Sequence, residues 1–263
     1  MVCISLFMRR VFAVTLTAAF MSGSALGQAR SSGDEQSGGL VDPFVDQLVA
    51  QTTEYLRSAE RVRLSAEVSR DRLLPSGHMA QFSRSVDIWL RRPDRLRVQM
   101  ISDLGTMRFF YDGALFSMQQ LERNLYASVE AKGEIGEVAD RLRTNLDVRL
   151  PLIDLLVADA YENFRDNVEQ AWYLGQHYVD GERMHHLLMS TALIDYQIWI
   201  EDSPTPLPRK VVVTYVARDG APQFIARDLK WDFNARMPDL AFTFAPPADA
   251  DEIQFAPASG EEK

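Results

Sequence analysis

Alternation of apolar and polar residues dominates the chain between residues 62 and 129. An apolar residue stands at every second position in successive short runs, which is the period of a half-buried strand. The runs cover residues 62–68, 82–90, 96–100, 107–111, 115–118 and 125–129. Short strands joined by turns in this way predict an antiparallel meander.

Helical spacing occurs at two places. Asp42 and Pro43 supply an N-cap and a first-turn proline, and apolar residues then recur every three or four positions, which predicts an amphipathic helix to about Glu60. Similar spacing from Ile135 to Leu146, followed by a second apolar segment after a proline, predicts a helical insertion over residues 135–158.

The strand pattern resumes at about residue 168 and continues to residue 234. Asp112-Gly113, Asp180-Gly181 and Asp219-Gly220 mark turns, and Asp-Gly suits a two-residue hairpin turn because both of its central positions need a positive φ. About eleven strands are predicted in total, in one domain over residues 42–256 of the mainly β (α+β) class. An antiparallel sheet of this length is expected to curl or close.

Both ends of the chain are predicted to lie outside this domain. Arg9 and Arg10 precede an apolar run over residues 11–20 and small residues ending at Gly27, which is typical of a secretory signal peptide over 1–27. The run is too short for a transmembrane helix, which needs about 20 apolar residues. The general export route is favoured, and the twin-arginine route is the alternative. Residues 28–41 read as a flexible linker and 257–263 as a frayed tail.

Charge and cysteine content narrow the function classes. The formal net charge is −9, from 28 basic and 37 acidic residues, and removal of Arg9 and Arg10 gives 26 − 37 = −11. Such an acidic surface disfavours nucleic acid as a partner. Cys3 is the single cysteine and lies in the leader, so the mature chain forms no disulfide and offers no thiolate to a metal.

Two adjacent histidines are the strongest candidates for a catalytic or metal-binding site. Neighbours on a strand point to opposite faces, so His185 and His186 cannot bind one metal together. With a turn at 180–181, His177 faces Met184 and lies diagonal to His186 on one face, but no third ligand is evident. A structural role is favoured. We therefore predict no catalytic residue, no metal site, no cofactor and no enzymatic activity.

Apolar side chains at alternating positions of neighbouring strands form a larger constellation. Such residues fit ordinary core packing. They fit equally well the lining of a cavity for an apolar ligand, because methionine side chains in such a lining can adapt to the shape of the ligand. The candidate ligand-binding residues are Phe82, Ile88, Leu96, Val98, Met100, Met107, Phe109, Phe116, Met118, Tyr196 and Ile198.

Several motifs support a resemblance over roughly residues 42–256. R-R-P-D-R-L-R-V, F-Y-D-G-A-L-F-S-M, P-L-I-D-L-L, V-D-G-E-R-M-H-H-L and P-L-P-R-K occur in this order. The chain resembles an uncharacterised bacterial family of predicted periplasmic proteins, itself similar to the outer-membrane lipoprotein carriers LolA and LolB. Where that family often has Cys-His-His, this chain has Met184-His185-His186, which argues against a shared thiol-histidine metal chemistry.

The resemblance implies a fold and a function. The fold is an unclosed antiparallel β-barrel whose N-terminal helix and central helical insertion act as a lid over an apolar cavity for acyl chains, without catalytic residues. We expect a periplasmic binding or carrier protein for an apolar small molecule, a lipid or an acyl chain. The alternatives are an envelope-protein interaction or sensing module and a hydrolase or metal enzyme that uses His177, His185 or His186.

Overall fold

The computed structural model describes residues 40–257, all of which belong to one compact unit. The predicted signal peptide, residues 28–39 of the predicted linker and the last six residues of the chain lie outside the described part. Within it, Leu40 and Val41 pair with the backbone of Ala171. The segment expected to act as a linker is therefore tied to the sheet by its last two residues.

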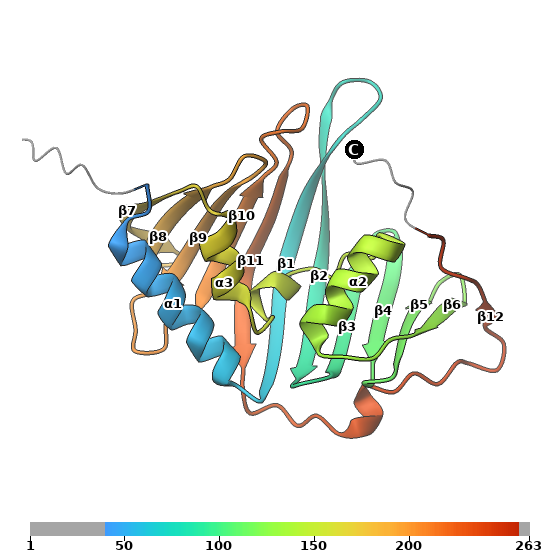
Figure 1. Cartoon of the computed structure of the whole chain (residues 1–263). Coiled ribbons are helices and arrows are strands. Elements are labelled where there is room, and N and C mark those ends of the chain that lie inside the picture. Colours follow the sequence, from blue (N-terminus) through green and yellow to red (C-terminus); the bar gives the residue numbers. More distant parts are fainter. Residues whose placement is uncertain (1–39, 258–263) are drawn as a thin grey trace, which may run out of the picture. The chain divides into compact units, whose positions relative to one another are not determined.

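Twelve strands form a single sheet that stays unclosed, since β12 and β7 are its two edges (Figure 1). The order is β12-β6-β5-β4-β3-β2-β1-β11-β10-β9-β8-β7. The strands are β1 (Arg61–Leu73), β2 (Met79–Arg91), β3 (Arg95–Ser102), β4 (Gly105–Tyr111), β5 (Leu115–Gln120), β6 (Leu125–Glu130), β7 (Gln170–Val179), β8 (Glu182–Ser190), β9 (Asp195–Glu201), β10 (Pro208–Thr214), β11 (Gln223–Asp232) and β12 (Asp251–Glu252). Neighbours pair antiparallel except β12 with β6. The predicted mainly β, unclosed fold class is confirmed.

Helix α1 (Pro43–Ser58) begins where its cap predicts. The carboxylate of Asp42 accepts a hydrogen bond from the backbone N–H of Phe44 at 2.8 Å, and Pro43 occupies the first turn. The helix ends slightly before Glu60 because Ala59 has extended backbone angles. Its buried residues (Val45, Leu48, Val49, Thr52 and Leu56) repeat every three or four positions.

The central insertion contains more than the predicted helical segment. Helix α2 (Ile135–Leu146) starts with a capping box between Glu134 and Glu137, followed by the 3-10 turn η1 (Ile153–Leu155). A further helix, α3 (Ala160–Asn167), lies beyond the expected end at residue 158. Its apolar contacts come from Tyr161 and Phe164 alone, too few for a helical pattern to stand out. A second 3-10 turn, η2 (Asp239–Ala241), follows the last long strand.

Helices α1, α2 and α3 all lie on one face of the sheet (Figure 1). We call it the helical face; it carries Leu64, Ile88 and Val98, whereas Arg63 and Asp87 lie on the opposite, open face. Because side chains alternate along each strand, the two sets separate cleanly. Two apolar clusters fill the helical face: one packs α2 and η1 on β1–β5 and extends to β10 and β11, and the other packs α1 and α3 on β7–β9.

The hairpin between β7 and β8 has the predicted two-residue turn. Asp180 has φ 50° and Gly181 has φ 85°, and Val179 pairs directly with Glu182. Positive φ at both central positions is the geometry that Asp-Gly favours. This turn sets the register that brings His177 opposite Met184.

Candidate ligand-binding face

The predicted lining residues of β2–β5 lie on the helical face, and most of them are core. Ile88, Val98 and Phe109 are direct cross-strand neighbours in one row, and Leu96 and Phe116 lie in the next. All of these side chains are at most 4% exposed. They pack against residues of α2 and of the segment from Leu150 to Leu156. This half of the helical face is therefore filled by the protein itself.

Three predicted methionines are less completely covered. Met100 and Met107 are paired across β3 and β4, and Met118 on β5 lies one row further along. They pack against the buried cluster yet remain partly exposed. The helices therefore leave an apolar margin on the face that they cover.

The other predicted lining residues are separated along the sheet. Tyr196 and Ile198 on β9 contact the cluster beneath α1 and α3. Burial raises the pKa of Tyr196 to about 12, with a smaller contribution from the charge of Asp154. Phe82 lies near the start of β2 and is 44% exposed. The guanidinium of Arg72 is 5.9 Å from the centroid of the Phe82 ring. Phe82 shares the helical face with the other candidates, and its role in ligand binding stays a prediction.

Arg92 fastens two helical segments to the corner between β2 and β3. Its guanidinium donates to the carbonyl oxygens of Leu56 (3.2 Å), Ala59 (3.2 Å) and Leu156 (2.8 Å). These acceptors belong to the end of α1 and to the segment after η1. Burial lowers the pKa of Arg92. The three carbonyl oxygens satisfy several of its five N–H donors. One side chain thus anchors both covering elements, a role that the motif R-R-P does not reveal.

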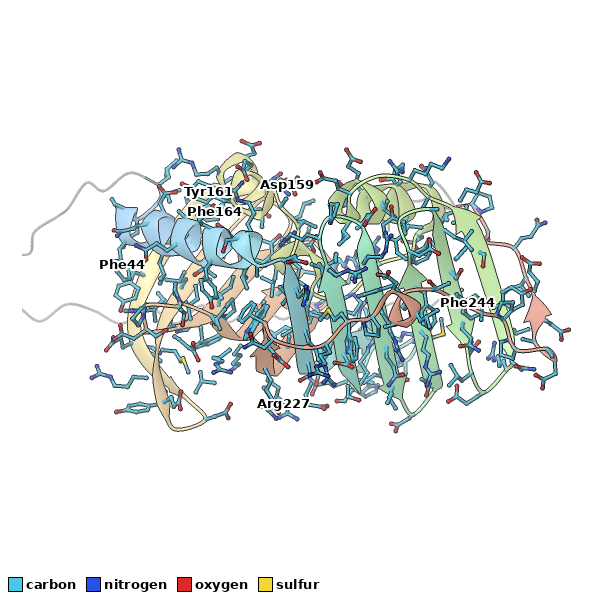
Figure 2. All side chains as sticks on the ribbon, turned by 90° about the horizontal axis from the view of Figure 1, so that it is seen from below. Phe44, Asp159, Tyr161, Phe164, Arg227 and Phe244 are labelled. Atoms are coloured by element: carbon cyan, nitrogen blue, oxygen red, sulfur yellow. The ribbon has the colours of Figure 1, made fainter. Side chains whose placement is uncertain are left out.

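A polar contact also joins α1 to α3. The carboxylate of Asp46 accepts from the hydroxyl of Tyr161 at 2.9 Å and from the guanidinium of Arg165 at 3.0 Å. Figure 2 shows Tyr161 and Phe164 of α3 beside α1. More than one hundred positions separate Asp46 from its partners in the sequence, so no local pattern predicts the contact.

The two adjacent histidines have different surroundings. His185 lies on the helical face, where its Nδ1 is 2.9 Å from the hydroxyl of Tyr173 and its Nε2 is 3.2 Å from Asp202. The ring of Phe44 lies 5.2 Å from that of His185. These contacts hold the start of α1 near the edge strand and satisfy the imidazole on both sides.

His186 lies on the open face with His177. Their Nδ1 atoms are 3.4 Å apart, and Nε2 of His186 lies 3.1 Å from Oε1 of Gln197. The ring of His186 also stacks on Trp199 at 4.0 Å. Among residues 40–257, no group of three His, Cys, Asp or Glu side chains is placed to hold a metal ion. His185 and His186 thus lie on opposite faces, and each has hydrogen-bond partners within the protein.

Two surface hollows of the described part lie elsewhere. One, of about 230 Å³, is on the open face between β1, β2 and β11, with Arg63, Glu67 and Asp87 in its lining. The other, of about 710 Å³, is broad and open, between α1 and the loop with Pro204 and Pro206. Neither is lined by any of the predicted apolar residues. On the helical face, the uncovered lining residues are those of the apolar margin and Phe82.

The fold and the face together define a class: an unclosed, mainly β sheet with an N-terminal helix and a central helical insertion on one face. Residues 45–256 match the family described as predicted periplasmic protein (DUF2092), and the chain belongs to this family. The resemblance inferred from the motifs is confirmed at that level. No curated protein matches the chain.

Comparison with solved structures gives distant similarities. An uncharacterised conserved protein from Thermus thermophilus has 9% identity and a TM-score of 0.47, with 80% of this chain and 99% of the other covered. A chain of the Pseudomonas aeruginosa MucA/MucB complex has 13% identity, a TM-score of 0.41 and coverages of 77% and 61%. A LolA superfamily protein from Nitrosomonas europaea has 11% identity, a TM-score of 0.31 and coverages of 75% and 96%. In residues 40–257, no helix is both long and apolar enough to cross a membrane.

Proposed function

We propose that this protein is an exported, non-catalytic binding protein of the periplasm that holds a lipid or acyl chain against the helical face of its sheet. The basic, apolar leader and the family's description support export, with cleavage near Gly27. The ligand lies against the predicted lining residues of the helical face, first at the exposed margin and then beneath α1 and α2 when these helices move aside. Binding is driven by burial, at about 0.8 kcal/mol for each methylene withdrawn from water.

The apolar margin beside the helices carries this proposal. Met100, Met107 and Met118 remain partly exposed next to a fully buried core, and Phe82 is 44% exposed on the same face. Exposed apolar surface that is continuous with a core often marks a binding site. Methionine side chains adapt to ligands of varied shape because they are unbranched and polarizable.

The contacts that hold the helices on the sheet are weak enough to let a ligand enter beneath them. Polar contacts from Arg92 and Asp46 hold α1 and the insertion in place, in addition to apolar packing. Such bonds are individually modest, about 0.5–1.5 kcal/mol net, or 1.5–3 where a charged group takes part. A ligand that buries several methylenes offsets the loss of one or two of them, so the helices can open and close again around it.

Titration with the apolar fluorophore N-phenylnaphthylamine tests the proposal. Met107→Gln places an amide on the margin and should weaken binding by about 1–2 kcal/mol, roughly five- to thirtyfold. The matched control is Arg108→Gln, the neighbouring residue on the open face, where Arg108 bonds Gln99 at 2.9 Å. Equal affinity in both variants, or no binding by the unchanged protein, would contradict a site on the helical face.

A second function, interaction with an envelope protein, is favoured by one observation. The edge strand β7 exposes Trp172 (42%), Leu174 (40%) and Tyr178 (72%). Residues 40–42 pair with this strand only at Ala171, and the rest of the edge, with its large apolar side chains, is suited to a partner that adds a strand. Stable capture of one envelope protein by the purified chain, lost on Trp172→Ser and without any bound lipid, would favour this function over the first.

A further inference from the structure

Arg84 is a cation in an apolar row of the helical face. It lies on β2 in register with Val68 of β1 and two residues from Val86, and both valines are at most 2% exposed. Alternation along this uninterrupted strand pair directs Arg84 to the same side as Val86. Its Nη1 is 3.8 Å from the sulfur of Met100, and the side chain is half-buried.

The charge of Arg84 has no acidic partner in the part of the chain that the structure describes. Neither Arg84 nor Arg70, which follows Val68 by two residues on β1, forms an ion pair there. On the open face of the same two strands, by contrast, Arg63 pairs with Asp87 at 2.9 Å. Burial, and then the charge of Arg70, lower the pKa of Arg84.

Among residues 40–257, the Arg84 guanidinium bonds only the thioether of Met100, and its other donors remain accessible to solvent. Arginine has five N–H donors, and a methionine sulfur is a weak acceptor. Buried charges in proteins are normally paired, because withdrawal from water is costly. A chain with nine more acidic than basic residues offers many carboxylates, yet none is placed here. The accessible donors are therefore available to an anion that comes from outside the chain.

The neighbours of Arg84 specify the rest of that ligand. Arg70 is the cross-strand neighbour of Phe82 on β2 and of Phe224 on β11, and Met100 is the cross-strand neighbour of Met107 on β4. These apolar side chains are all at least partly exposed. A cationic pair beside an apolar margin matches an amphiphile with an anionic head and an acyl chain, rather than a free anion.

We infer that Arg84, together with Arg70, binds the anionic head group of an amphiphile whose acyl chain lies against Met100 and Met107. This inference rests on the proposed function and names the class of its ligand. Guanidinium groups bind phosphate and carboxylate oxygens with charge-assisted, often bidentate hydrogen bonds. The head group would thus lie at the margin of the helical face while the chain extends beneath the helices.

Calorimetric titration with three probes tests the inference: dodecyl phosphate, the uncharged dodecyl maltoside and inorganic phosphate, each below its micelle concentration where one applies. The unchanged protein should bind dodecyl phosphate at least tenfold more tightly than dodecyl maltoside. Arg84→Gln should remove this preference and leave the affinity for dodecyl maltoside unaltered. Arg227→Gln, on an exposed side chain that points away from the helices in Figure 2, is the matched control and should change neither affinity.

These titrations distinguish failure of the anionic head-group site from failure of the proposed lipid-binding function. Equal affinity for the two dodecyl probes, or loss of both in a folded Arg84→Gln variant, would overturn the inference and leave the apolar site standing. Inorganic phosphate that binds as tightly as dodecyl phosphate would show a site for a free anion and would also overturn it. If neither dodecyl probe binds, the proposed function fails together with the inference.

Discussion

His185 and His186 are neighbours in the chain and belong to opposite surfaces of the molecule. Tyr173 and Asp202 hold His185 on the helical face, whereas His186 is 7% exposed against Trp199 on the open face. The alternation of a strand predicts this division. The partners could not be predicted, because they come from other strands and from a loop.

The buried position of His186 leads to a pH dependence of stability. Burial lowers its pKa from 6.5; the bond to Gln197 opposes this shift, and the nearby His177 and Lys210 add to it. Below about pH 6.5 the unfolded chain binds a proton that the folded imidazole resists, so this contribution to stability is present above that pH and is lost as the pH falls.

His186→Gln should flatten the dependence of unfolding free energy on pH between pH 7.5 and pH 5. Denaturant unfolding at a series of pH values measures this slope. His78→Gln, at an exposed histidine in the loop between β1 and β2, is the control and should leave the slope unchanged. A His186→Gln slope identical to that of the unchanged protein would contradict the assigned role of burial.

At the scale of elements, the helices owe their position to side chains that are remote in sequence. The cap of α1 at Asp42 is local and was predictable, whereas the fastening of its other end by Arg92 spans 33 to 36 positions. Similarly, the two-residue strand β12 pairs parallel with β6 through Asp251 and Leu125. Local periodicity contains no signal for such pairings.

Arg92→Met should loosen α1 and the insertion together. The substitution keeps most of the apolar stem but leaves the carbonyls of Leu56, Ala59 and Leu156 without this donor, at an expected cost of about 1–3 kcal/mol. Hydrogen exchange should increase within residues 43–58 and 150–157 and change little in the strands. Arg149→Met, at an exposed arginine whose bond is to Asp147, is the control. Uniform exchange across all elements would contradict a fastening role for Arg92.

At the scale of the whole molecule, the sheet was predictable because its two faces differ so clearly in polarity. Val62, Leu64 and Val68 alternate with polar residues along β1, and the same contrast recurs in the neighbouring strands. Helix α3 was missed because it buries no residue of its own. Which lining residues stay uncovered, such as Phe82, depends on where the helices end, and this is a property of the assembled fold.

Native mass spectrometry of the protein purified from the periplasm can detect a lipid or acyl chain held on the helical face. We expect a stoichiometric adduct with the mass of a lipid or acyl compound, which is extracted by organic solvent and exchanged by dodecyl phosphate. Retention of the adduct should fall in Met107→Gln and not in Arg108→Gln. A protein that carries only its own mass, and that takes up no amphiphile when one is supplied, would rule out ligand binding on the helical face.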